Sequence, residues 1–372
     1  MEAVTTDFVG VLQRNPQIPI AWWLLARLRK QTPEANHVVQ LRGLLGTRVL
    51  GAANVAVLAR ALHKELDDLG DHDAAWRALE TICTAKRSIE PHDLEQPRRL
   101  VDGLIAWSLV AVPVPVIPLP TGKVPVFIVG MHRSGTALLE QLLDGSPQVR
   151  GVGELYDFTS AMRHATDHHC KGVIDATIVE RAAGVDFAEL GRRYLDGMAW
   201  RLGEQAFFTD KLQSNFLNIG FICRALPQAR ILHMVRDPVE TCFSNLRELF
   251  SEANPYSDDQ AELADYFVQY RRLMSHWHAA WPGRILDVDY AELTRDPEEV
   301  MRKVAAFCRI DYIDAMRDPR SSTRAVSTAS AVQVRDRVVR REVPKWAPYA
   351  RHLEPLMAAL QRGGVEVPGL PA

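Results

Sequence analysis

The sequence predicts an α/β protein, in which a P-loop-like, doubly wound and mostly parallel sheet is preceded by an all-α helical domain. Three observations carry the fold class. A β-branched apolar run over 124–129 is followed by a short glycine-containing loop and then by leucines at helical spacing. Further strand-length apolar runs alternate with helical segments, which is typical of parallel sheets. Before residue 110, apolar residues recur only at helical spacing.

The composition is that of a globular protein. The 372 residues are 47% hydrophobic and 24% charged, with a net charge of −2. These values argue against disordered and fibrous classes, and no global field favours nucleic acid or an acidic membrane as a partner. The five cysteines are scattered without a CxxC pair, which favours a reducing compartment. No signal-like segment and no apolar run of about 18 residues is evident, so a cytoplasmic location is expected.

The N-terminal third, residues 1–111, is predicted to be a tetratricopeptide-like helical domain. A helix over Val55–Leu69 ends at Gly70, and the phrase Leu69–Ala75 resembles the turn between the helices of such a repeat. Small Ala75 stands where the two helices must approach closely. A generic helical hairpin is the open alternative. This domain is expected to bind the acceptor or a protein partner.

A proline-rich segment separates the two predicted domains. Four prolines within 112–123 force extended backbone, so this segment is predicted to be a linker. A helix over about 94–109 precedes it and is expected to pack on the next domain. The α/β domain is then predicted to span 124–372.

The loop between the first strand and its helix predicts an anion site. Gly130 and Gly135 have the spacing of a Walker A loop, yet Thr136 stands where the lysine belongs, and Arg133 is the only cation in the loop. Backbone N–H groups and a positive helix end converge there, which usually serves phosphate. We therefore predict a phosphate cradle that does not serve ATP and Mg²⁺ in the usual way. An ordinary strand-to-helix turn is the alternative.

Two later strands end in cations. The runs over 206–211 and 230–236 finish in Lys211 and Arg236, at the edge where a doubly wound sheet binds ligands. Ser244 follows on the next helix and is expected to share one phosphate with Arg236. Tyr290 ends a further strand over 284–290.

One carboxylate and one histidine-rich segment are candidates for further chemistry. Glu154 follows two glycines shortly after the phosphate loop, where it is a candidate general base; a solvated surface residue is the alternative. A helical stretch is expected from Asp157 to about Trp200, and the segment His164–Cys170 within it contains metal-type ligands but no clear third ligand for a pair of histidines. An exposed polar helix end is the favoured interpretation, and no metal is predicted.

At this point a family resemblance is clear, because residues 124–348 resemble the sulfotransferase family, closest to the tyrosylprotein type and its bacterial relatives with helical N-terminal domains. The loop resembles the one that holds the 5′-phosphosulfate of 3′-phosphoadenosine 5′-phosphosulfate (PAPS). The segment Val235–Pro238 with Ser244 resembles the 3′-phosphate motif. Further positions match the family in order and spacing. The matching residues are Arg133, Ser134, Gly135, Thr136 and Ala137 in the loop, Glu154 and Lys211 as catalytic residues, and Tyr290, Ser330 and Lys345 as later PAPS contacts.

The resemblance implies in-line sulfuryl transfer from PAPS to a hydroxyl-bearing acceptor. Glu154 would take the acceptor proton, while Arg133 and Lys211 neutralise developing charge and Ser330 adds a hydrogen bond. The 3′-phosphate would be held by Arg236, Ser244 and Lys345, and no metal is required. The family's loop commonly ends in Thr or Ser where this chain has Ala137, and the lost hydroxyl is expected to weaken donor binding by ~1 kcal/mol.

Two other functions stay open from the sequence. A P-loop-type kinase would depend on ATP and Mg²⁺, against which the missing Walker lysine argues. A catalytically inactive, nucleotide-binding helical-repeat scaffold is the third class. The acceptor is equally open among a protein tyrosine, a small phenol, an alcohol, a sugar and an amine.

Overall fold

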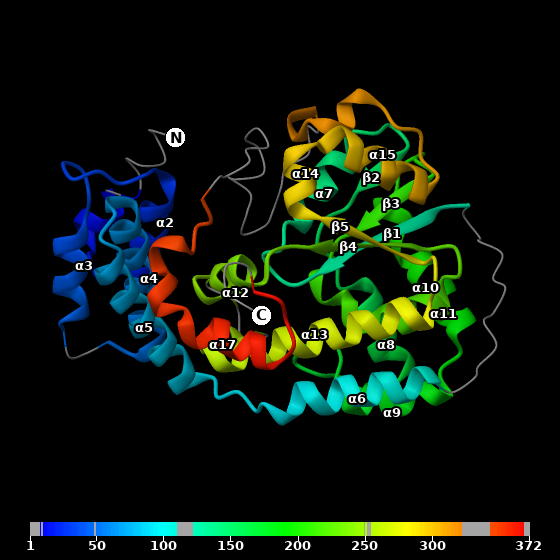
Figure 1. The fold of residues 1–372 in the computed structure, drawn as a ribbon, viewed down its shortest axis with the longest axis horizontal. Helices are drawn as coiled ribbons and strands as arrows, with labels where there is room; N and C mark the ends of the chain where they lie inside the picture. Colours follow the sequence, from blue (N-terminus) through cyan, green and yellow to red (C-terminus); the bar gives the residue numbers. More distant parts are fainter. Residues whose placement is uncertain are drawn as a thin grey trace. The chain divides into compact units, whose positions relative to one another are not determined.

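The computed structural model describes residues 8, 10–47, 50–109, 122–248, 250, 254–321 and 343–367. The chain divides into two compact units (Figure 1). A helical unit comprises 1–94, 242–266 and 343–372, and a sheet unit comprises 95–241 and 267–342. This grouping differs from a single division at the proline-rich segment, because two later segments join the helical unit. The domain boundaries expected from the sequence stay a prediction.

The helical unit is built around a hairpin of α4 (Ala52–Leu69) and α5 (His72–Ile89). Gly70 ends α4 in the left-handed region at φ 79°, and the Asp71 side chain caps α5 by accepting from the Ala74 N–H. Ala75 is fully buried, and its carbonyl accepts a hydrogen bond of 2.8 Å from His63 Nδ1. The small side chain therefore lets the two helices approach, whichever repeat class the hairpin belongs to. The same unit contains the helices α2 (Pro19–Leu28), α3 (Val38–Leu45) and α17 (Glu354–Arg362).

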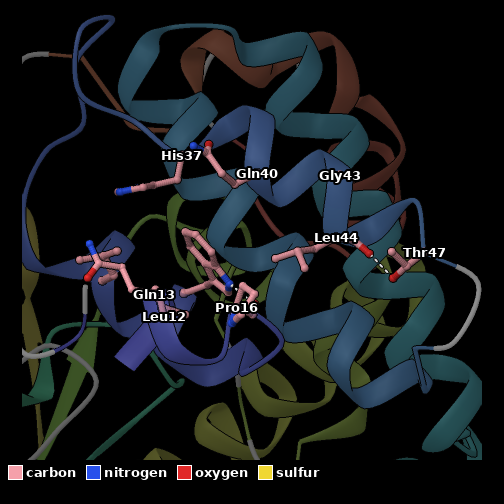
Figure 2. A pocket seen from close by; sticks show the side chains of 10 residues that line it. Leu12, Gln13, Pro16, His37, Gln40, Gly43, Leu44 and Thr47 are labelled. Atoms are coloured by element: carbon pink, nitrogen blue, oxygen red, sulfur yellow. Dashed lines mark hydrogen bonds between the residues drawn. The ribbon is translucent and has the colours of Figure 1, made fainter. Parts of the chain in front are cut away.

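An apolar pocket lies within the helical unit (Figure 2). It has a volume of about 530 Å³, and its lining comes from the segment before α2, from α2 and from α3. His37 and Gln40 lie on one side of it, and Leu44 lies beside Thr47, whose hydroxyl donates to the Leu44 carbonyl at 2.6 Å. The Trp22 indole donates to the Pro16 carbonyl at 2.8 Å.

The sheet unit contains five parallel strands in the order β2-β3-β1-β4-β5. Because all strands are parallel, their carboxyl ends meet at one edge of the sheet. The central strand is the apolar run that follows the proline-rich segment. The strands are β1 (Val124–Gly130), β2 (Val149–Gly151), β3 (Phe207–Asp210), β4 (Arg230–Val235) and β5 (Ile285–Asp289).

Helices cover both faces of this sheet (Figure 1). Alternate residues of β1 point to opposite faces. Val126 and Ile128 belong to a buried cluster with residues of α7 (Thr136–Leu143), α14 (Tyr290–Arg295) and α15 (Pro297–Cys308). On the other face, the Phe127 ring lies 5.9 Å from Phe158 of α8 and 5.8 Å from Tyr194 of α10. The doubly wound α/β architecture predicted from the sequence is therefore confirmed.

The region 157–200 differs from the single helical stretch that the sequence suggests. It forms three helices, α8 (Asp157–Ala165), α9 (Ala176–Arg181) and α10 (Phe187–Met198). Asp167 ends the first in the left-handed region at φ 47°. The side chains of Asp175 and Asp186 cap the N-termini of α9 and α10, so two new helices begin within this region.

Two of the remaining helices belong to the sheet unit, and two have residues in both units. In the described part of the chain, no helix combines the length and the apolar character needed to cross a membrane. The helices are α6 (Glu95–Leu109), α11 (Ile219–Ala225), α12 (Pro238–Leu246) and α13 (Gln260–Ala280), of which α12 and α13 contribute residues to both units.

Candidate active site

The loop between β1 and α7 has a backbone that only particular residues allow. Gly135 begins α7 with φ 108°, and a Cβ added there would lie 2.4 Å from Cδ2 of Tyr290. A Cβ on Gly130 would lie 2.7 Å from the Met234 carbonyl oxygen. Both positions therefore require glycine, because the loop passes against a neighbouring ring and a neighbouring strand. Arg133 also has a positive φ of 68°.

A buried hydroxyl lies unpartnered in this loop. Ser134 is 1% exposed, and its Oγ has no hydrogen-bond partner among the residues that the structure describes. Buried polar groups are nearly always paired, so an unpaired one at a helix N-terminus fits a loop built to hold an anion. Gly135 is the N-cap residue of α7, and as a glycine it has no side chain to cap the first N–H groups of the helix. Ala137 is buried and offers no hydroxyl, so the loop's contribution at that position is limited to its backbone.

The predicted base and the predicted catalytic lysine meet at the carboxyl edge of the sheet. Lys211, which follows β3, is fully buried, and its Nζ lies 2.6 Å from Glu154 Oε1. Gln213 donates to the same oxygen at 3.1 Å and to Thr136 Oγ1 at 3.3 Å. The side chain of Gln213 thus bridges the carboxylate to the phosphate loop. Because the Glu154 side chain keeps 35% of its exposure, an acceptor can reach it from solvent.

A second carboxylate positions the segment that carries Glu154. Glu140 of α7 is 2% exposed, and its Oε1 accepts from the Gly153 N–H at 2.9 Å and from Thr209 Oγ1 at 2.8 Å. The Gly153 carbonyl in turn accepts from the Lys211 N–H at 3.1 Å. Sequence reasoning did not single out Glu140 or Gln213. A charged residue inside the run Leu138-Leu139-Glu140-Gln141-Leu142 was the available signal for the former.

Arg236, at the end of β4, connects the loop to β5 and α14. One guanidinium nitrogen donates to the Arg133 carbonyl at 3.0 Å, and another pairs with Glu240 Oε1 at 2.9 Å. The guanidinium lies 4.3 Å from the centre of the Tyr290 ring, a cation–π contact. Tyr290 is the first residue of α14, directly after β5. The structure therefore brings Arg133, Gly135, Arg236 and Tyr290 together.

Two ionisable groups beside the site have strongly shifted pKa values. Burial raises the pKa of Asp210 to about 8, opposed by the hydrogen bond of 2.9 Å that it accepts from the Tyr194 hydroxyl. Burial lowers the pKa of His132 in the loop to about 4, so the imidazole is neutral at pH 7. Its Nε2 lies 3.3 Å from Ser214 Oγ. The positive charge near the loop therefore comes from Arg133, Lys211 and Arg236, and His132 adds none.

Three of the predicted contacts do not enter this geometry. Ser330 lies outside the described residues. Ser244 and Lys345 belong to the helical unit, and their roles stay predictions. In the histidine-rich segment, His164 Nε2 contacts Arg193 and His168 Nε2 contacts Asp175. Within the described ranges, the one group of three metal-type ligands that lie close together is elsewhere, at His233, His278 and Asp287.

The fold and the loop define a P-loop-like α/β protein that lacks a Walker lysine. The sequence model of the sulfotransferase family matches residues 125–315, just over half of the 372 residues. The chain therefore belongs to the sulfotransferase family. The match covers β1 to β5, and with them the loop, Glu154, Lys211 and Arg236.

Individual relatives are more distant. The chain is 30% identical to an uncharacterized protein of Aquifex aeolicus over 346 residues, 90% of this chain and 45% of that protein. It is 24% identical to a putative protein-tyrosine sulfotransferase of Caenorhabditis briggsae over 184 residues, 49% of this chain and 64% of that protein. The chain thus spans about half to two thirds of the length of these relatives.

A solved structure is also similar. It is the sulfotransferase domain of the olefin synthase of Synechococcus PCC 7002, at 19% identity and a TM-score of 0.45. The similarity covers 69% of this chain and 100% of that domain.

Proposed function

We propose that this protein transfers the sulfuryl group of PAPS to a hydroxyl-bearing acceptor, with Glu154 as the general base. The observation that supports this most directly is the contact of Glu154 with the buried Lys211, together with Gln213, which links the same carboxylate to Thr136 at the phosphate loop. Sulfuryl transfer from a phosphate leaving group to a hydroxyl needs a base, a cation and a loop that binds the phosphate. At this edge of the sheet the Glu154 carboxylate, the buried Lys211 ammonium and the loop after β1 are proposed to supply them. Family membership supports the reaction class.

The donor is proposed to lie across the tips of β1 and β4. The loop N–H groups, the Ser134 hydroxyl and Arg133 would hold the 5′-phosphosulfate, with Thr136 and Ala137 in the first turn of α7. Arg236 would hold the 3′-phosphate together with Ser244 and Lys345, and Tyr290 would pack beside the nucleotide. The Ser134 hydroxyl fits this donor, because an anion would supply the hydrogen-bond partner that the described part of the chain does not.

The transfer step is proposed to be an in-line displacement. The acceptor oxygen forms a bond to sulfur while the bond from sulfur to the bridging phosphate oxygen breaks. The acceptor proton passes to Glu154, and 3′-phosphoadenosine 5′-phosphate (PAP) leaves with the electron pair of the broken bond. Lys211 would pass its hydrogen bond from Glu154 to the bridging oxygen as charge develops there. Ser330 is proposed as a further donor to the transferred group.

The proposal predicts that Glu154→Gln lowers kcat by about 10²- to 10⁴-fold while PAP affinity stays within threefold of the wild type. The glutamine keeps the volume and the contacts with Lys211 and Gln213 but accepts no proton. The assay is transfer of labelled sulfate from PAPS to a panel of phenols, alcohols, sugars, amines and tyrosine peptides, with calorimetry of PAP binding alongside.

The same pair of measurements separates the three functional classes. A kinase would bind ATP with Mg²⁺ in preference to PAP. A scaffold would bind PAP and transfer sulfate to no acceptor. Full turnover by Glu154→Gln on the preferred acceptor would show that another group is the base.

A further inference from the structure

Three side chains on the sheet unit form a compact group that the proposed reaction does not use. His233 of β4 and Asp287 of β5 are register partners on adjacent parallel strands, so their side chains project on the same face. His278, near the end of α13, joins them. His233 Nδ1 lies 2.7 Å and His278 Nε2 lies 2.8 Å from Asp287 Oδ1, and the three atoms lie within 4.8 Å of one another.

We propose that His233, His278 and Asp287 bind a divalent transition-metal ion, with Zn²⁺ as the ion to test first. Two imidazole nitrogens and one carboxylate oxygen are ligands that zinc and its neighbours accept, whereas Mg²⁺ and Ca²⁺ prefer oxygen ligands alone. Three protein ligands leave a fourth tetrahedral position for water. The site is assembled by two strands and a helix, so the backbone holds the ligands near one another before any ion binds.

The inner histidine has the support that a metal ligand needs. His233 is 2% exposed, and its Nε2 contacts the Tyr270 hydroxyl, which is itself buried and hydrogen-bonded to the backbone of Met131. Such an outer partner fixes the orientation of the ring and aims Nδ1 at the ion.

The outer ligands provide both access and charge. The His278 and Asp287 side chains are 37% and 53% exposed, so an ion can enter from solvent. The site therefore offers one carboxylate oxygen and two imidazole nitrogens to a dication.

The ligand atoms lie near the spacing that an ion requires. Ligand atoms bound to zinc at ~2.0–2.1 Å in a tetrahedron lie about 3.3 Å apart. The two imidazole nitrogens lie 2.7 and 2.8 Å from Asp287 Oδ1, and all three ligand atoms lie within 4.8 Å of one another. Binding therefore requires the Asp287 and His278 side chains to shift, which their exposure allows, while His233 stays in place against Tyr270.

The test is calorimetric titration of the untagged, full-length protein with ZnCl₂ in a buffer free of chelators and nucleotide. We expect one Zn²⁺ per chain, and at least a tenfold loss of affinity in His278→Ala and in Asp287→Asn. His276→Ala, two residues away on α13, and His168→Ala, in the other histidine-rich segment, are matched controls that should retain wild-type affinity. Circular dichroism of each variant checks that it is folded.

A second readout identifies the coordination directly. Co²⁺ in place of Zn²⁺ should give the intense visible absorption of a tetrahedral site in the wild type and in His276→Ala, and lose it in His278→Ala. Absence of binding, unchanged affinity in both ligand variants, or only the weak octahedral Co²⁺ spectrum would each overturn the proposal and leave a hydrogen-bonded His–Asp–His cluster. Because no donor-binding residue takes part, these outcomes are independent of whether the protein uses PAPS.

Discussion

At the scale of single residues, the carboxylate that most affects the proposed base is one that touches no substrate. Glu140 holds the Gly153 N–H and the Thr209 hydroxyl from within α7. The neighbouring residue of Gly153 is Glu154, so the buried carboxylate fixes the backbone from which the base projects. We therefore regard Glu140 as a positioning residue.

Glu140→Ala is predicted to lower kcat by about tenfold or more and to destabilise the protein by about 1–3 kcal/mol, because it removes the acceptor of the buried Thr209 hydroxyl and of the Gly153 N–H. Glu140→Gln keeps an oxygen in the same place and should restore most of both quantities. The measurements are steady-state kinetics with PAP affinity, and urea unfolding. If the glutamine variant recovered stability without recovering kcat, the positioning role would be wrong.

Arg236 is predicted to distinguish the 3′-phosphorylated nucleotide from one without that group. Removing a charged hydrogen-bonding partner costs about 1.5–3 kcal/mol, or roughly 10- to 150-fold in affinity. Arg236→Ala should therefore weaken PAP binding by that factor while changing the affinity for 5′-AMP by less than threefold. Equal losses for both nucleotides would mean that Arg236 acts only by supporting the Arg133 carbonyl.

At the scale of elements, the turn from β1 into α7 and the start of α14 constrain each other. Gly135 has no Cβ, and the Tyr290 ring occupies the space that one would fill. The ring in turn lies under the Arg236 guanidinium. The loop, the tip of β4 and the end of β5 thus form one packed corner of the sheet.

Gly135→Ala is predicted to abolish detectable PAP binding, since it combines an unfavourable φ of 108° with a contact of 2.4 Å. Gly184→Ala is the matched control: no atom lies within 4 Å of a Cβ at that position, and its φ is not positive. Calorimetry with PAP and thermal unfolding of both variants would test this. Wild-type PAP affinity in Gly135→Ala would show that the loop does not form the donor site.

At the scale of the whole molecule, the buried Asp210 makes stability depend on pH. Its folded pKa of about 8 lies above the value of about 3.9 expected in the unfolded chain. The folded protein therefore holds a proton that the unfolded chain releases, and the stabilisation from this group, complete below about pH 4, is lost as pH rises towards 8. The lowered pKa of His132 acts in the opposite direction below about pH 6.5.

Asp210→Asn removes the difference in proton binding between the folded and unfolded states at this position, and the asparagine oxygen can still accept from the Tyr194 hydroxyl. The free energy of unfolding of the variant, relative to the wild type, should rise between pH 5 and pH 8. Urea unfolding followed by circular dichroism at both pH values gives this difference, in which the effect of His132 cancels. Parallel pH profiles for the two proteins would contradict the raised pKa.

The sheet and the positions at which its strands end could be predicted from the sequence, because apolar runs of strand length and the loop glycines are local signals. It also predicted that Lys211 and Glu154 would meet at one edge, which follows from the parallel direction of the strands. It missed Glu140 and Gln213, whose roles depend on contacts with distant segments. It also missed the break of 157–200 into three helices, which depends on the capping side chains of Asp175 and Asp186.

One short helix contacts both halves of the proposed reaction centre. The N-terminus of α7 carries the loop that would grip the donor, while Glu140 and Asp144 further along it accept from the N–H groups of Gly153 and Gly151. Any displacement of α7 would consequently move the donor and the base together. A substitution among residues that contact only the acceptor should therefore change the choice of acceptor and leave the distance between the donor sulfur and the Glu154 carboxylate unchanged.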